Sequence, residues 1–166
     1  MNKEQLAEAS AAELDLNRAL VNVDISKGYE ECLALFDRFY DENVEVASES
    51  HPAPLVGKAH VRPIIFNFLM PLHVMAEIGR LSVRLRYSPL FSDRRGEQHS
   101  EWSLDVVGAT GRGVLVSWSS ARRWKGARVV YERHSDHRQS GEPLSFLDLD
   151  FGQRRLGLKS TLHDIR

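Results

Sequence analysis

The sequence predicts one α+β domain in which helices come first and a strongly twisted antiparallel sheet follows. Residues 3–22 and 26–40 have helical composition and spacing, whereas from Ala76 onward apolar and polar residues alternate. The chain has 166 residues, about the length of a single domain. Its 42% hydrophobic and 27% charged residues are ordinary for a globular protein.

Two helices are predicted at the amino-terminal end. Residues 3–22 are rich in Ala, Leu and Glu, which favour helix, and a capping box at residues 10–13 would divide this stretch into two helices. Asp24 or Ser26 can cap the following helix, which is expected to run to about Tyr40. Its apolar residues follow helical spacing, namely Tyr29, Cys32, Leu33, Phe36 and Tyr40.

A short strand and a third helix are expected next. Residues 43–48 alternate polar and apolar side chains, and the two prolines of residues 51–54 end that strand. The third helix opens at Gly57 and tolerates Pro63 in its first turn. Pro71 is expected to bend it or end it.

Four long strands complete the predicted domain. The strands are expected at residues 77–88, 98–108, 112–124 and 127–136. Short glycine-containing connections join the later strands, so an antiparallel meander is the economical topology. The domain is expected to span residues 1–138, with residues 139–166 as an extension that packs partly on it and frays at its end.

Composition argues against several classes of protein. The net charge is −1, which leaves no electrostatic footprint for nucleic acid. No apolar run is long enough to span a membrane, and the first residues lack the pattern of a secretion signal. The single cysteine, Cys32, fits a reduced thiol, so we expect a cytoplasmic protein.

Three stretches resemble the nuclear transport factor 2-like superfamily, and within it the SnoaL-like branch that includes small polyketide cyclases. Residues 34–46 (ALFDRFYDENVEV) are similar to the helix-turn-strand near the start of that fold. Residues 55–61 (LVGKAHV) resemble its Leu-x-Gly entry into the next helix. Residues 123–136 (RWKGARVVYERHSD) resemble its closing hairpin.

The resemblance covers about residues 10–138 and implies a cone-shaped curved sheet wrapped against helices. An apolar pocket would lie at the open end and take a small hydrophobic ligand. Family members often form homodimers through the outer sheet face, and we expect the same here. The fold alone does not fix an activity, because the superfamily holds enzymes and pure binding modules.

The catalytic residues expected from the resemblance lie near the end of the last strand. SnoaL-like cyclases use an acid/base carboxylate there, and the matching position here is His134, or Asp136 if the register shifts by two. Strict alternation puts both on one face, so Asp136 could orient His134 as the acid/base. Residues 3–22 lack the tyrosine of ketosteroid isomerases, and residues 46–48 lack their carboxylate base, unless Glu49 has taken that role.

Other residues are expected to line the pocket. Tyr40 and His51 could assist there, and Phe68 could form part of one wall. Trp102 and Trp118 could floor a pocket for a flat ligand, although tryptophans on strands are more often core or interface residues. Residues 122 and 123, both arginine, are expected to protect an edge hairpin from pairing with other chains.

No metal or cofactor is expected. Residues 134–137 (HSDH) contain two histidines, but alternation sends His137 to the face opposite His134, so the cluster cannot chelate unless the strand breaks there. The leading hypothesis is therefore cofactor-free proton transfer on a hydrophobic carbonyl or polycyclic substrate, as in isomerisation, aldol-type cyclisation or dehydration. The alternative is a non-catalytic module that binds a small ligand or serves dimerisation.

Overall fold

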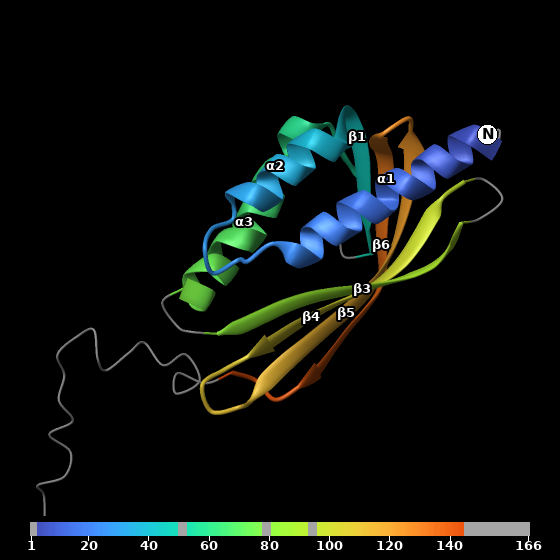
Figure 1. Ribbon diagram of the computed structural model, residues 1–166. Coiled ribbons are helices and arrows are strands. Elements are labelled where there is room, and N and C mark those ends of the chain that lie inside the picture. The colour runs from blue at the N-terminus through green and yellow to red at the C-terminus, as the bar shows by residue number, and fades with distance from the viewer. Residues whose placement is uncertain (1–2, 50–52, 78–80, 93–95, 145–166) are drawn as a thin grey trace, which may run out of the picture.

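The computed structural model describes residues 3–49, 53–77, 81–92 and 96–144, which form an α+β fold (Figure 1). Helices come first and long strands follow, as the sequence predicts. The helices are α1 (Lys3–Asn22), α2 (Glu30–Phe39) and α3 (Lys58–Glu77). The strands are β1 (Tyr40–Ser48), β2 (Leu55–Val56), β3 (Ser82–Ser92), β4 (Gln98–Val107), β5 (Gly113–Lys125) and β6 (Arg128–Gly141).

The six strands form one mixed sheet in the order β2-β1-β6-β5-β4-β3. Strands β3 to β6 form the expected antiparallel meander. The expectation of a purely antiparallel sheet is wrong, because β1 lies parallel to β6, with Ser48 opposite His134. The parallel pair arises because β1 and β6 are joined through the whole meander rather than by a hairpin.

Two helices are longer than predicted. Helix α1 is continuous across residues 10–13 because both ends of the expected capping box make tertiary contacts instead. Ser10 Oγ donates to Gln98 Oε1, and the Glu13 carboxylate accepts from Arg122. Helix α3 continues through Pro71. Proline has no N–H to donate to the carbonyl one turn earlier, but Pro71 lies on the exposed side of the helix, where water can hydrate that carbonyl.

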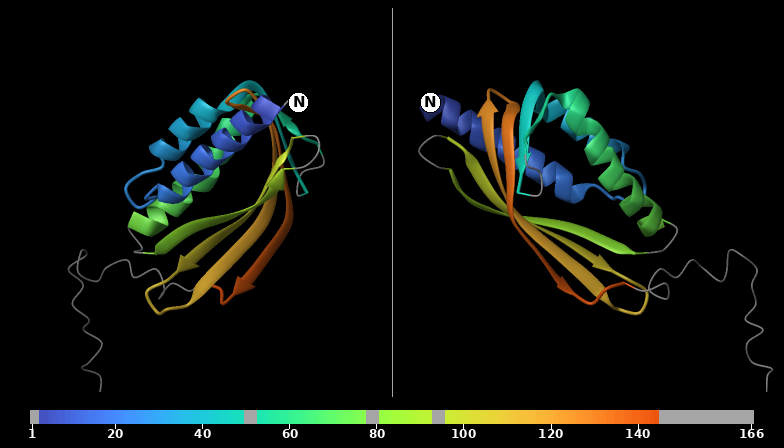
Figure 2. Two further views of the ribbon diagram at one scale, coloured as in Figure 1. Left: turned by 45° about the vertical axis from the view of Figure 1, so that its right-hand side comes forward. Right: turned by 180° about the vertical axis from the view of Figure 1, so that it is seen from behind.

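The three helices all cover one face of the sheet, which we call the inner face, and the sheet twists away beneath them (Figure 2). The main apolar core lies between the helices and strands β1, β5 and β6. Its most buried members include Leu16 at 1% exposure and Val44 and Val129 at 0%. A smaller cluster around Leu104 packs against the carboxyl-terminal half of α3. Within the described residues, no helix is long and apolar enough to cross a membrane.

A bulge in β6 changes which residues face the helices. Ser119 pairs with Ser135 and Ser117 with Arg138, so two steps along β5 match three along β6. Asp136 takes up the extra residue with φ of +57°, in the left-handed region. Strand β6 then continues to Gly141, beyond the boundary at residue 138 expected for the domain. Residues 145–166 lie outside the described part.

Leu16 should anchor α1 to the sheet. Leu16→Ala is expected to lower the free energy of unfolding by about 2–5 kcal/mol, since it removes a buried side chain and leaves a cavity. Urea unfolding followed by circular dichroism measures this loss. Ile64→Ala, at a helical side chain that is 44% exposed, is the matched control and should cost about 0.5 kcal/mol or less. Equal losses in both variants would contradict this packing.

Candidate functional site

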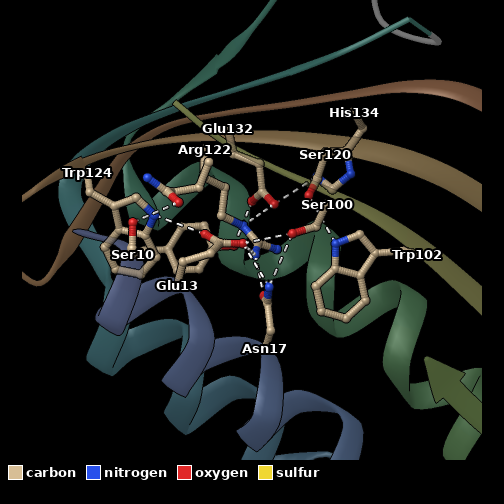
Figure 3. Close-up of polar contacts among 12 residues, drawn as sticks. Ser10, Glu13, Asn17, Ser100, Trp102, Ser120, Arg122, Trp124, Glu132 and His134 are labelled. Atoms are coloured by element: carbon tan, nitrogen blue, oxygen red, sulfur yellow. Dashed lines mark hydrogen bonds and ion pairs between the residues drawn. The ribbon is translucent and has the colours of Figure 1, made fainter. Parts of the chain in front are cut away.

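A cluster of buried charged groups lies between α1 and the inner face of the sheet (Figure 3). Its centre is Arg122 on β5, a residue only 3% exposed. Arg122 Nε donates to Glu132 Oε1 at 2.7 Å, and Arg122 Nη1 donates to Glu13 Oε1 at 3.0 Å. Both carboxylates are themselves buried, at 5% exposure for Glu13 and 4% for Glu132. One guanidinium therefore joins the first helix to the last two strands.

The backbone brings these groups together in a simple way. Arg122 and Glu132 are direct partners across the β5–β6 ladder, so their side chains leave the sheet on the same face. Glu13 and Asn17 are one turn apart on α1 and lie on the side that also buries Leu16. The cluster thus forms wherever α1 docks on the centre of the sheet.

Hydrogen bonds satisfy the remaining polar atoms around Glu13. Its Oε1 accepts from Asn17 Nδ2 at 2.9 Å, and its Oε2 accepts from Trp124 Nε1 at 2.9 Å. Asn17 Oδ1 in turn accepts from Arg122 Nη1 at 2.7 Å. The Glu13 carboxylate thus accepts from Arg122, Asn17 and Trp124, which supply the donors that a buried carboxylate requires. We call the group the Arg122 cluster; its members are Glu13, Asn17, Tyr40, Ser100, Arg122, Trp124 and Glu132.

Tyr40 completes the shell of Glu132. The phenol, at the junction of α2 and β1, donates to Glu132 Oε2 at 2.6 Å. Burial raises the pKa of Tyr40 well above its ordinary value, so the phenol stays protonated as a donor. Burial alone would also raise the pKa of the Glu132 carboxyl. The charge of Arg122, the neighbouring His134 and the Tyr40 hydrogen bond outweigh it and hold that pKa far below its usual range.

His134 lies at the edge of this cluster. Its Nε2 is 3.5 Å from Glu132 Oε1, and 27% of its side chain is exposed. The cluster holds two carboxylates, Glu13 and Glu132, against the one guanidinium of Arg122. A protonated His134 would balance the remaining negative charge. His134 therefore lies between the buried charges of the cluster and solvent.

The bulge separates His134 from the partner expected for it. The prediction that Asp136 shares its face is wrong: Asp136 Oδ2 accepts from Ser135 Oγ, and Asp136 lines a groove on the opposite face. His137, expected on that opposite face, instead has its ring centroid 6.5 Å from that of His134. The left-handed residue at 136 reverses the alternation of the residues after it.

Glu49 lies close to Asp136 rather than inside the cluster. Its Oε2 accepts from the Asp136 backbone N–H at 3.0 Å, and its own N–H donates to the His134 carbonyl at 3.3 Å. The parallel β1–β6 pair brings the end of β1 to this point. Glu49 is exposed and contacts the backbone of β6, whereas the imidazole of His134 approaches the carboxylate of Glu132.

The expected pocket residues fall into different places. Trp102 is buried at 3% exposure, donates its indole N–H to Ser120 Oγ and stacks on Trp118 with centroids 6.2 Å apart. Tyr40 is buried in the Arg122 cluster. Phe68 is 57% exposed on the solvent side of α3, so it forms no wall against the core. His51 lies outside the described residues.

A crevice of about 400 Å³ opens beside the cluster, between α1 and strands β3 and β4. Leu14, Pro89 and Leu90 give it an apolar rim, whereas the buried side chains of Glu13, Asn17 and Ser100 form a polar floor. His134 is not among the residues that line it. No group of three or more metal-ligating side chains occurs in the part of the chain that the structure describes.

Sequence reasoning missed the Arg122 cluster. Arg122 was expected on a protective hairpin edge, but β5 lies inside the sheet, and residues 118–124 alternate so that Ser120, Arg122 and Trp124 face inward with Trp118. The helical spacing of Ala9, Glu13, Leu16 and Asn17 was a usable signal, since it puts two polar residues on the buried face of α1. The pairing of Glu132 with Arg122 depends on register, which the sequence does not show.

Solved structures with the same architecture include a protein provisionally named a polyketide cyclase from Xanthomonas campestris pv. campestris. It is 13% identical, with a TM-score of 0.51 and coverage of 78% of this chain and 90% of that one. AclR from Streptomyces galilaeus, provisionally named a hydroxylase, is 14% identical, with a TM-score of 0.50 and coverage of 78% and 79%. An NTF2-like protein of unknown function from Cytophaga hutchinsonii is 12% identical, with a TM-score of 0.49 and coverage of 75% and 95%.

At identities this low, these likenesses show that the chain shares the α+β fold of such proteins, and they show the fold alone. No family model matches the chain, and no curated protein matches its sequence. The activity must therefore be argued from the residues themselves.

The Glu132 carboxyl should give the fold a measurable dependence on pH. Because folding lowers its pKa, its contribution to the free energy of unfolding is complete above the ordinary value of 4.5 and falls as pH drops toward the lower folded value. Glu132→Gln is expected to be less stable than wild type at pH 7. Between about pH 4.5 and 3, the free energy of unfolding of Glu132→Gln should fall less steeply with decreasing pH than that of wild type. The two slopes should differ by up to about 1.4 kcal/mol per pH unit.

Urea unfolding at a series of pH values measures both slopes. Glu42→Gln is the matched control, since the Glu42 side chain is 81% exposed in its ion pair with Lys58. It should change the free energy of unfolding by about 1 kcal/mol or less. Parallel pH profiles for wild type and Glu132→Gln would rule out an ionised Glu132 held by Arg122.

Proposed function

We propose that the chain is a small-molecule enzyme that catalyses cofactor-free proton transfer on a hydrophobic carbonyl substrate, with His134 as the acid/base and Glu132 as its positioning residue. The observation that carries the proposal is the 3.5 Å approach of His134 Nε2 to a buried, ionised carboxylate. Glu132 here takes the orienting role that sequence reasoning gave to Asp136. The fold shared with a provisionally named polyketide cyclase supports the class of substrate.

The geometry gives the two imidazole nitrogens different roles. Nε2 faces the Glu132 carboxylate, which accepts a hydrogen bond from the Nε2–H group and so fixes that tautomer. Nδ1 is then the basic nitrogen and can take a proton from the carbon beside a substrate carbonyl. The imidazolium so formed returns the proton to another carbon in an isomerisation, or to a departing hydroxyl in a dehydration.

The Arg122 cluster favours the charged intermediate of this cycle. The negative charge left over from Glu13, Glu132 and Arg122 stabilises the imidazolium without any movement of buried groups, because all of them are already held by hydrogen bonds. The half-exposed edge of His134 leaves room for substrate on the solvent side. Trp118, half-buried next to the bulge, offers an apolar surface there.

A second candidate, a ligand-binding module, is favoured by the crevice beneath α1. Its apolar rim and polar floor suit a small amphipathic molecule. The polar floor is already satisfied internally, since Glu13, Asn17 and Ser100 bond to one another. A molecule in this crevice would be held rather than transformed.

The catalytic role of His134 predicts a large loss on its removal. His134→Ala should slow the exchange of substrate α-hydrogens with deuterated solvent by about 10²- to 10⁴-fold, followed by NMR on a panel of enolisable polycyclic ketones. His137→Ala, which removes a neighbouring exposed imidazole, should stay within a few-fold of wild type. Added imidazole should partly rescue His134→Ala. Unchanged exchange in His134→Ala would exclude His134 as the acid/base.

The crevice predicts a different pattern if the chain only binds its ligand. Leu14→Trp fills the crevice and should weaken binding of a polycyclic ketone at least tenfold by isothermal titration calorimetry, while His134→Ala binds as wild type does. Ala11→Trp, on the exposed side of the same helix, is the control and should not change the affinity. Equal affinity in Leu14→Trp and wild type would show that this crevice is not the binding site.

A further inference from the structure

A second cavity lies on the face of the sheet turned away from the helices, which we call the outer face. It has a volume of about 580 Å³ and crosses strands β3 to β6. Its lining includes Ser103, Ser117 and Ser119, and also the aromatic residues that alternate with these serines and their neighbours along the strands, namely Tyr87, Trp102 and Trp118. No member of the Arg122 cluster lines this cavity, and it shares Tyr87 with the crevice beneath α1.

The strand register arranges the side chains of this groove in two rows. One row crosses the sheet from Arg86 through Ser103 and Ser117 to Arg138. The adjacent row runs from Ser88 through Glu101 and Ser119 to Ser135. Hydroxyl groups thus form the middle of the floor, and the two arginines stand at opposite ends of one row.

The bulge in β6 supplies the wall of the groove. The extra residue, Asp136, turns out of the ladder with its left-handed backbone and lines the cavity beside Arg138. A flat strand at this place would continue the alternation and leave an open surface. The same bulge that separates Asp136 from His134 therefore gives the outer face a concave site.

The charges that line the groove balance one another. Arg86 and Arg138 contribute two positive charges, and Glu101 and Asp136 contribute two negative ones. Four serine hydroxyls, each both donor and acceptor, fill the space between them. Such a lining favours neither an anion nor a cation, and it does not favour an apolar molecule, which would leave these polar groups without partners.

We propose that the outer groove binds a neutral, polyhydroxylated small molecule of the carbohydrate type. Its hydroxyl groups can exchange hydrogen bonds with the serines and accept charge-assisted bonds from the arginines. The volume lies within the range of roughly 300–1,000 Å³ that is usual for small-molecule sites.

Titration calorimetry with neutral trisaccharides (maltotriose, cellotriose and N,N′,N″-triacetylchitotriose) tests this proposal on the full chain. At least one should bind, and Ser103→Val with Ser117→Val should weaken it about tenfold or more by removing two hydroxyl partners. Valine suits a strand, so the double variant should fold, which circular dichroism verifies. Arg86→Ala should also weaken binding, whereas Arg84→Ala, on the same strand and face but outside the groove, should not.

Two results would overturn the proposal. One is no binding of any trisaccharide at millimolar concentration, or binding that the serine and Arg86 variants leave unchanged. The other is a dimer in sedimentation analysis that Ser103→Arg dissociates, since that would show this face to be an interface between copies of the chain. Neither result would affect the test of His134, which lies on the other face of the sheet.

Discussion

The structure depends on one guanidinium, that of Arg122, buried with a carboxylate on each side. A charge taken out of water is costly unless it is paired and hydrogen-bonded, and here each donor of Arg122 that faces the helix or the last strand meets a carboxylate or amide oxygen. Such a group tolerates only a narrow set of positions for its neighbours. It therefore determines how α1 lies across the sheet and which residues of β6 face inward.

Because of this interaction, the space beneath α1 differs from a simple apolar pocket. The cluster occupies the middle of the inner face, and its donors and acceptors satisfy one another, so the buried groups hold charge in place rather than wait for a ligand. The proposed chemistry is therefore placed at the edge, where the excess negative charge of the cluster lies next to the partly exposed imidazole of His134. That is why the proposed acid/base is His134, and why its positioning residue is the buried Glu132 rather than an exposed carboxylate.

Periodicity was enough to predict the three helices, the meander and the fold class, because apolar spacing reports directly on burial, but it did not predict the two-residue strand β2. The error at Asp136 has a specific physical cause: alternation assumes a regular strand, and one left-handed residue reverses the faces after it. Residues 128–140 of β6 contain no glycine or proline that would mark this bulge.

The Arg122 cluster could not be predicted from the sequence, for a different reason. Arg122 is 109 residues from Glu13 in the sequence, so this ion pair depends on the tertiary docking of α1. Arg122 is 10 residues from Glu132, and that ion pair depends on the register between β5 and β6. The sequence also predicts that Arg122 is a surface residue of an edge hairpin, whereas in the structure β5 lies between β4 and β6. Burial of Glu13 and Asn17 could have been inferred from helical spacing, but their shared partner could not.

The most direct test of this central interaction compares Arg122→Met alone with the triple variant that also carries Glu13→Gln and Glu132→Gln, by urea unfolding at pH 7. We predict that Arg122→Met loses about 3–5 kcal/mol, because it leaves two buried carboxylates unpaired, and that the triple variant recovers more than half of this loss. A triple variant no more stable than Arg122→Met would contradict the claim that Arg122 acts by compensating the charge of these two carboxylates.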